Sequence, residues 1–282
     1  MEQEKREWLY QEKIPSSGPI GRLAVSLKIS VLGSSSSGNC TFVSTRQTKI
    51  LLDAGLNLTQ TIKRLNSIGE SLEEIDALVI SHEHTDHVNG ITGLLSKKDI
   101  PVYIVEETFE AINPRISCGK LERIKAGQSF QLKDLKVSPF SIPHDAVDPL
   151  GFTLEAEGLK IGHVTDLGYV TDLVSQRLKG CDVIVLESNH DLEMLKVGPY
   201  PWPLKQRILG REGHLSNEIA GQFFGEEFDG QARYIILAHL SESNNHPDIA
   251  RMVAAEALEP RGFSLQNLIV ATKSAATAAI EL

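Results

Sequence analysis

The chain has 282 residues, 41% hydrophobic and 23% charged, which is enough apolar material for one large core. Its formal net charge of −9 argues against broad, sequence-independent attraction to nucleic acid, which requires a basic surface. No stretch is long enough to cross a membrane, and the charged N-terminus has no apolar segment typical of a secretory signal. Cys40, Cys118 and Cys181 are too widely spaced for a disulfide framework, so we expect reduced thiols in a cytoplasmic protein.

Residues 1 to about 22 are polar, with Pro, Ser and Gly from 15 to 19, which predicts an N-terminal extension at 1–26 before one domain at 27–282. Apolar runs bounded by turns predict strands at 27–32, 41–44, 49–52, 77–80, 102–105, 136–142, 151–155, 160–164, 183–187, 233–238 and 267–270. Helical periodicity predicts helices at 58–67, 88–96, 106–111, 170–178, 203–208, 217–224 and 247–257. This rhythm predicts an α/β fold in which two sheets pack face to face with helices outside.

The six residues from His82 to His87, His-Glu-His-Thr-Asp-His, directly follow the strand predicted at 77–80. Side chains alternate along an extended backbone, so His82 and His84 can point the same way. If a helix begins just after them, Asp86 and His87 face a second point about one metal–metal distance away. These ligands suit Zn²⁺, or Mn²⁺ or Fe where oxygen ligands dominate. Solvated loop residues are the alternative, but three histidines at one strand end favour a metal site.

The pattern His82-x-His84-x-Asp86-His87 resembles the signature of the metallo-β-lactamase-fold hydrolases. The resemblance implies a four-layer αββα sandwich with two metal ions, and further ligands at the ends of later strands. This sequence has His144, Asp166 and His239 after such apolar runs, in the expected order. It also has Asp53 after Ile50-Leu51-Leu52, where the family carries an aspartate that orients a ligand imidazole from behind.

The ligands implied by the resemblance form two sets, one of His82, His84 and His144 and one of Asp86, His87 and His239, with Asp166 bridging them. The first set has the ligand number of a catalytic zinc with an open position. Two ions about 3.5–4 Å apart hold a hydroxide that serves as the nucleophile, so no protein nucleophile is required. We accordingly assign Asp86 a catalytic role as well as a ligand role.

His214 precedes a predicted amphipathic helix in the segment Gly-His-Leu-Ser-Asn. It resembles the mobile histidine that phosphodiesterase branches of the superfamily direct toward the scissile phosphate, so we expect it to be catalytic. The alternative is a plain helix N-terminus capped by Ser216 or Asn217.

Three further residues are candidates for binding substrate. Ser37 and Asn39 belong to the loop at 33–40, whose hydroxyls and backbone donors could cradle a phosphate, although Gly/Ser runs also form ordinary turns. His190 follows the strand predicted at 183–187 and faces either the site or the surface.

Longer blocks resemble the YycJ (WalJ) group of this superfamily. They include the loop at 33–40 and the segments at 52–55, 81–87, 165–169, 187–191, 213–217 and 239–245. The resemblance implies a metal-dependent nuclease that hydrolyses phosphodiesters in DNA, with 5′-to-3′ exonuclease action proposed. A small-molecule hydrolase, such as a cyclic phosphodiesterase or a lactonase, would use the same metal ligands and is the alternative function.

Overall fold

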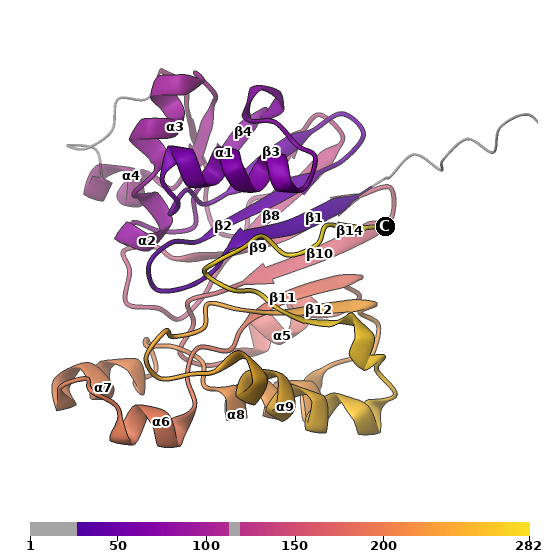
Figure 1. Cartoon of the computed structure of the whole chain (residues 1–282). Coiled ribbons are helices and arrows are strands. Elements are labelled where there is room, and N and C mark those ends of the chain that lie inside the picture. The colour runs from indigo at the N-terminus through magenta and orange to yellow at the C-terminus, as the bar shows by residue number, and fades with distance from the viewer. Residues whose placement is uncertain (1–26, 113–118) are drawn as a thin grey trace, which may run out of the picture.

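The computed structural model describes residues 27–112 and 119–282, so the extension predicted at 1–26 and Cys118 lie outside the described residues. Two seven-stranded sheets face each other. Figure 1 shows α1 and α3 over the outer face of one sheet, and α8 and α9 over the outer face of the other. The predicted αββα sandwich is thereby confirmed. None of the helices in the described ranges is long and apolar enough to cross a membrane.

The first sheet has the strand order β14-β1-β2-β3-β4-β5-β6. Its strands are β1 (Lys28–Gly33), β2 (Cys40–Ser44), β3 (Lys49–Leu52), β4 (Ala77–Val79), β5 (Val102–Ile104), β6 (Leu121–Arg123) and β14 (Ile280–Glu281). The helices between them are α1 (Leu58–Ser67), α2 (Thr85–Val88), α3 (Ile91–Lys97) and α4 (Glu106–Ile112), with a 3₁₀ turn at Leu72–Glu74.

The second sheet has the order β13-β12-β11-β10-β9-β8-β7. Its strands are β7 (Phe130–Leu132), β8 (Leu135–Ser141), β9 (Leu150–Ala156), β10 (Leu159–Val164), β11 (Val183–Glu187), β12 (Tyr234–Ala238) and β13 (Leu268–Val270). Its helices are α5 (Asp172–Leu178), α6 (Leu192–Val197), α7 (Trp202–Ile208), α8 (Asn217–Gln222) and α9 (Pro247–Leu258). A π-helical turn at Phe223–Glu227 continues α8, and 3₁₀ turns lie at Glu259–Arg261 and Leu265–Asn267.

Strands buried on both faces supply the cores of the three interfaces between layers. In β11, Val183 and Val185 point into the core between the sheets, whereas Ile184 and Leu186 pack toward the helices of the second sheet. This alternation explains why the sequence reads as a continuous apolar run there rather than as apolar-polar alternation.

The prediction of one continuous helix at 88–96 is wrong, because the structure has two helices there, α2 and α3. The break falls at Gly90, where an added Cβ would lie 1.9 Å from the backbone oxygen of Leu56. α6 and the strands β6, β7 and β14 were not predicted from the sequence. These elements have two to six residues each, too few for periodicity to show.

The order of the strands brings the segments that carry the site to one edge. β10, β11 and β12 run parallel, with Val164 opposite Leu186 and Glu187 opposite Ala238. The residues that follow these strands therefore emerge side by side. β3 and β4 are also parallel, so Asp53 emerges next to the histidine-rich loop.

Candidate metal centre

The loop after β4 carries the histidine-rich motif and is held by the buried side chain of Asp53. The backbone N–H of Ser81 donates to Asp53 Oδ1 at 2.8 Å, and the Ser81 hydroxyl donates to Oδ2 at 2.9 Å. The same Oδ2 lies 2.8 Å from Nδ1 of His87, so one carboxylate fixes both ends of the motif. α2 begins directly after its N-cap, His84, which puts Asp86 and His87 in the first turn.

Three imidazoles form the first donor group, which we call the histidine group: His82, His84 and His144. Their ligand atoms lie within 4.8 Å of one another, and Nε2 of His144 is 3.2 Å from Nδ1 of His84. His144 comes from the loop after β8, and its Nδ1 lies 3.1 Å from the backbone oxygen of Gly213. Because a carbonyl can only accept, Nδ1 carries the proton and Nε2 keeps a lone pair for a cation.

Two carboxylates and two imidazoles form the second donor group, which we call the mixed group: Asp86, His87, Asp166 and His239. Nε2 of His239 lies 3.2 Å from Asp86 Oδ2, and Nε2 of His87 lies 3.2 Å from Asp166 Oδ2. The other oxygen of Asp166 is 3.9 Å from Nε2 of His144, so this carboxylate stands between the two groups.

The two groups differ in electrostatics. Burial lowers the pKa of His82 well below its ordinary value, and burial also lowers the pKa of His144. Burial acts in the same direction on His87 and His239, but carboxylates led by Asp166 outweigh it and raise the pKa of both well above the ordinary value. Burial thus favours the neutral form of His82 and His144, whereas the carboxylates of the mixed group favour the protonated form of His87 and His239.

Backbone strain coincides with this centre. Asp53, Asp166 and His239 have φ angles of 61°, 61° and 56°, in the left-handed region that side-chain-bearing residues rarely adopt. Each follows directly or closely on a buried strand. Such conformations cost on the order of 1–3 kcal/mol and persist where the surroundings impose them, commonly at functional sites.

Two buried atoms show that these residues fit metal ions. His82 Nε2 and Asp166 Oδ2 make no hydrogen bond with any residue of the described ranges. A buried polar atom without a hydrogen bond costs about 1–3 kcal/mol. Asp166 Oδ2 has the ion-pair contact with His87, and a cation between the groups would satisfy both atoms. Imidazole nitrogens with carboxylate oxygens are donors suited to divalent metals such as Zn²⁺ and Mn²⁺.

Glu187, at the end of β11, joins His214 to this centre, and the sequence analysis did not identify it as a site residue. Its Oε1 lies 2.8 Å from Nδ1 of both His214 and His239. Its Oε2 accepts the backbone N–H groups of Leu167 and Leu215. Burial opposes ionisation, but His214 and His239 hold the pKa of Glu187 at about 2. The sequence feature that could have identified Glu187 as a site residue is its position at the carboxyl end of β11, which runs parallel to β10 and β12.

The structure places the three predicted substrate-binding residues differently. Asn39 lies against the mixed group, with Nδ2 3.0 Å from both Asp86 Oδ2 and His87 Nε2. Ser37 is exposed and donates to Glu242. The side chain of His190 is 1% exposed, so it is not positioned to touch a substrate. Burial lowers its pKa to about 4.

The loop at 33–40 uses its polar groups mainly within the protein. Ser34 Oγ accepts the backbone N–H of His239 at 2.6 Å, and Ser35 N–H donates to Asn39 Oδ1. The loop therefore supports the strained backbone of His239 and the position of Asn39, rather than presenting free donors to a phosphate.

The comparisons with known proteins agree with this arrangement. The family model described as the beta-lactamase superfamily domain matches residues 48–239. Among curated proteins, exodeoxyribonuclease YycJ of Bacillus anthracis is 36% identical over 242 residues, which cover 85% of this chain and 92% of that protein. Exodeoxyribonuclease WalJ of Streptococcus pneumoniae serotype 2 is 34% identical over 239 residues, covering 83% of this chain and 89% of that protein.

Solved structures show the same fold at low sequence identity. The metallo-β-lactamase fold protein YhfI from Bacillus subtilis superposes with a TM-score of 0.69 at 17% identity, over 90% of this chain and 99% of that one. Zn²⁺-bound PqqB from Methylobacterium extorquens gives 0.64 at 16% identity, over 90% and 100% of the two chains. The chain belongs to the β-lactamase superfamily and, within it, to the family of YycJ and WalJ. It is a metal-dependent hydrolase.

Proposed function

We propose that the protein is a phosphodiesterase that degrades DNA as an exonuclease, with residues 27–282 as its hydrolase domain. It would hold two divalent ions, Zn²⁺ or Mn²⁺ or Fe, on His82, His84, Asp86, His87, His144, Asp166 and His239. The observation that carries the proposal is Asp166, whose carboxylate lies between the two donor groups. Its Oδ2 is 3.2 Å from Nε2 of His87, and its Oδ1 is 3.3 Å from Nδ1 of His239 and 3.9 Å from Nε2 of His144. The exodeoxyribonuclease names of its relatives support DNA as the substrate, and the resemblance to their group supports 5′-to-3′ action.

Bound ions at these positions would activate water at neutral pH and neutralise charge on the phosphate oxygens. The chain itself supplies the proton for the leaving oxygen. Glu187 accepts a hydrogen bond from Nδ1 of His214, and His214 lines the adjoining cavity, so Nε2 is the ring nitrogen left to act on a substrate. A proton carried on Nε2 can pass to the departing alkoxide, a step typically worth about 10²–10⁴ in rate.

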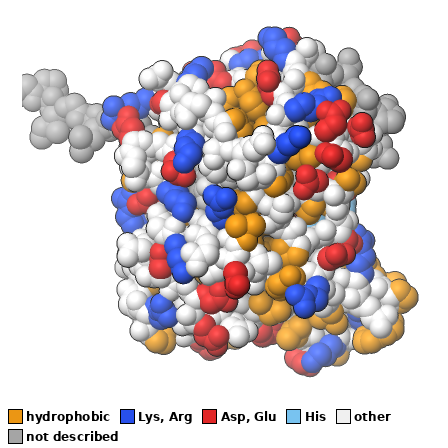
Figure 2. All heavy atoms as spheres, turned by 180° about the vertical axis from the view of Figure 1, so that it is seen from behind, with side chains coloured by type: hydrophobic (Ala, Val, Ile, Leu, Met, Phe, Trp, Pro, Cys, Tyr) orange, Lys and Arg blue, Asp and Glu red, His pale blue; other side chains and the backbone are white. Residues whose placement is uncertain are grey.

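Attraction for DNA is concentrated at the metal centre. The net charge is −9, and the face drawn in Figure 2 intermixes acidic and basic side chains. The two basic residues of α7, Lys205 and Arg207, do not form an exposed basic surface for phosphates either. Lys205 is buried and donates to the backbone oxygens of Lys196 and Gly198. Arg207 pairs with Asp145. DNA binding should therefore depend on metal more than on salt-sensitive surface contacts.

The test is hydrolysis by metal-loaded protein of end-labelled DNA, end-labelled RNA and bis(p-nitrophenyl) phosphate, with Mn²⁺ or Zn²⁺. We expect DNA to be degraded faster than RNA, with a 5′ label released early as a short product and a 3′ label retained on shortening strands. Hydrolysis of the nitrophenyl ester alone would contradict the nuclease proposal and favour the small-molecule hydrolase.

His214→Ala tests the proton donor. The variant should keep its metal and lose about 10²–10⁴ in rate on DNA. It should lose far less on bis(p-nitrophenyl) phosphate, because nitrophenolate leaves without a proton. His246→Ala, at the exposed N-cap of α9, is the matched control and should behave as wild type. Equal losses on both substrates would remove the general-acid role.

A further inference from the structure

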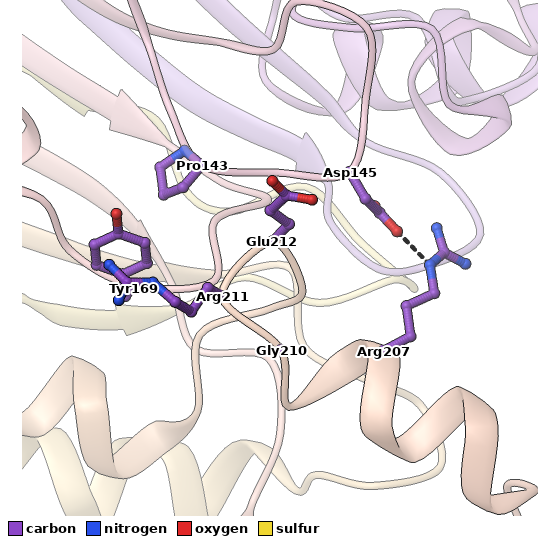
Figure 3. A pocket seen from close by; sticks show the side chains of 7 residues that line it. All are labelled: Pro143, Asp145, Tyr169, Arg207, Gly210, Arg211 and Glu212. Atoms are coloured by element: carbon purple, nitrogen blue, oxygen red, sulfur yellow. Dashed lines mark hydrogen bonds and ion pairs between the residues drawn. The ribbon is translucent and has the colours of Figure 1, made fainter.

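A cavity of about 500 Å³ opens beside the metal centre (Figure 3). Cavities that bind small molecules commonly have about 300–1,000 Å³. Its lining residues come from three segments next to residues of the centre. Pro143 and Asp145 flank His144, Tyr169 follows Asp166 by three positions, and residues between 207 and 212 precede His214. A ligand in this cavity is therefore held by the same backbone that holds the reacting groups.

Asp145 forms the wall between this cavity and the histidine group. Its Oδ1 lies 3.6 Å from Nε2 of His144 and 4.0 Å from Nε2 of His84, and its Oδ2 pairs with Arg207. Asp145 and Arg207 also line a smaller cavity of about 170 Å³ that contains His214. The two cavities thus adjoin across one ion pair, and a substrate that reaches His214 can extend into the larger one.

Arg211 and Tyr169 form the opposite side of the larger cavity. The guanidinium carbon of Arg211 lies 4.4 Å from the centre of the Tyr169 ring. Figure 3 shows this pair on one side and the Asp145–Arg207 pair on the other. Gly168 allows the segment that carries Tyr169 to pack directly against the backbone of Arg211. A Cβ added at Gly168 would lie 2.2 Å from the backbone oxygen of Arg211.

The charges of the cavity favour a base over a phosphate. Arg207 and Arg211 are balanced by Asp145 and Glu212, so a phosphate gains no net attraction. Bases, in contrast, stack on aromatic rings and on guanidinium planes. Carboxylates such as that of Glu212 can accept hydrogen bonds from the N–H groups of an unpaired base.

We propose that this cavity binds one unpaired nucleobase of the DNA, from a nucleotide next to the scissile phosphodiester, with Tyr169 and Arg211 as its stacking surface. This inference rests on the proposed nuclease function and deepens it. A base in this cavity cannot also be paired, so the substrate is a single-stranded end, or a duplex end whose terminal pair has opened.

The experiment compares base-bearing and abasic ligands on the metal-loaded protein. One arm measures KM and kcat for a single-stranded oligonucleotide and for copies with an abasic site at the first or second position. The other measures binding of a deoxynucleoside monophosphate against deoxyribose 5-phosphate by calorimetry. We expect wild type to prefer the base by about tenfold in both arms, the scale of one stacked base.

Arg211→Ala and Tyr169→Ala should reduce that preference to about twofold or less, while hydrolysis of bis(p-nitrophenyl) phosphate stays at the wild-type rate. Tyr169→Phe retains the ring and should keep the preference. Arg123→Ala is the matched control, because Arg123 covers the ring of Phe109 at 4.7 Å on β6, away from the centre. Equal treatment of base-bearing and abasic ligands by wild type, or a preference that survives both alanine substitutions, overturns the proposal.

The two proposals fail in different ways. If DNA is not cleaved while the nitrophenyl ester is, the nuclease function fails, and the calorimetric arm still decides whether the cavity recognises a base. If DNA is cleaved without any preference for a base, the nuclease function stands and the base-binding cavity does not.

Discussion

The two donor groups of the metal centre differ in what holds their imidazoles from behind. In the histidine group, Nδ1 of His82 faces the Ser81 hydroxyl and Nδ1 of His144 faces a backbone carbonyl. In the mixed group, Nδ1 of His87 and of His239 each lies 2.8 Å from a buried carboxylate. A carboxylate behind a ligand imidazole fixes its orientation and makes it a stronger base. The mixed group should therefore bind a divalent ion more tightly.

The largest expected effect comes from Asp166, which the two groups share. Asp166→Asn keeps the size of the side chain and tolerates the left-handed backbone, but removes the negative charge between the groups. We expect bound metal to fall from about two equivalents to one or fewer, and hydrolysis to fall by about 10³ or more. Metal analysis after gel filtration and kcat on DNA measure this. Asp172→Asn, exposed at the start of α5, is the control. Two retained ions with normal activity would rule out the shared role.

Removing the carboxylates from behind the mixed group should have the next largest effect. Asp53→Asn and Glu187→Gln should each weaken binding of one ion by about 10–100-fold, the usual scale for such partners of ligand histidines, and leave the other ion nearly unaffected. Competition with a chromophoric chelator measures both affinities. Glu70→Gln replaces a buried carboxylate that pairs with Lys28 and Lys49, far from the centre, and should not change either affinity. Loss of both ions in parallel would contradict the expected difference in affinity between the two donor groups.

The wild-type protein should release its ions in two steps. The histidine group contains no carboxylate, and His84 is partly exposed, so its ion should leave first under a weak chelator. We expect about one equivalent to remain after the first step. His84→Ala should start from that state and show only the slow step. A single release phase in wild type would show that the groups do not differ in affinity.

The smallest effect concerns Cys40, which is buried at the start of β2 beside Asp53. Burial, with the nearby Asp53 charge, raises the pKa of its thiol, so no thiolate is available to either donor group at neutral pH. Cys40→Ala should change kcat by less than about twofold and lower stability by about 1 kcal/mol. Denaturant unfolding and the DNA assay check the two parts separately. A large loss of activity with metal retained would show that the thiol takes part.

Much of the fold could be predicted because its signals are local. The bounds of α1 and β11 agree with those predicted, since a capped amphipathic pattern and a bounded apolar run need no distant partner. The motif from His82 to His87 likewise has its ligand spacing within six residues. The short strands were not predicted because pairing at the sheet edges determines them. The break at Gly90 was not predicted because it depends on a close approach to the backbone of Leu56.

The local sequence thus specifies the donors and the strands that carry them. The partners of these donors are set by the way the strands come together. Glu187 became the residue behind both His214 and His239 because three parallel strands end side by side. His190, also at a strand end, turned into the interior instead. Lys205 lies buried and donates to the backbone oxygens of Lys196 and Gly198. These outcomes depend on contacts between residues far apart in the chain, which strand order and register set and local sequence does not.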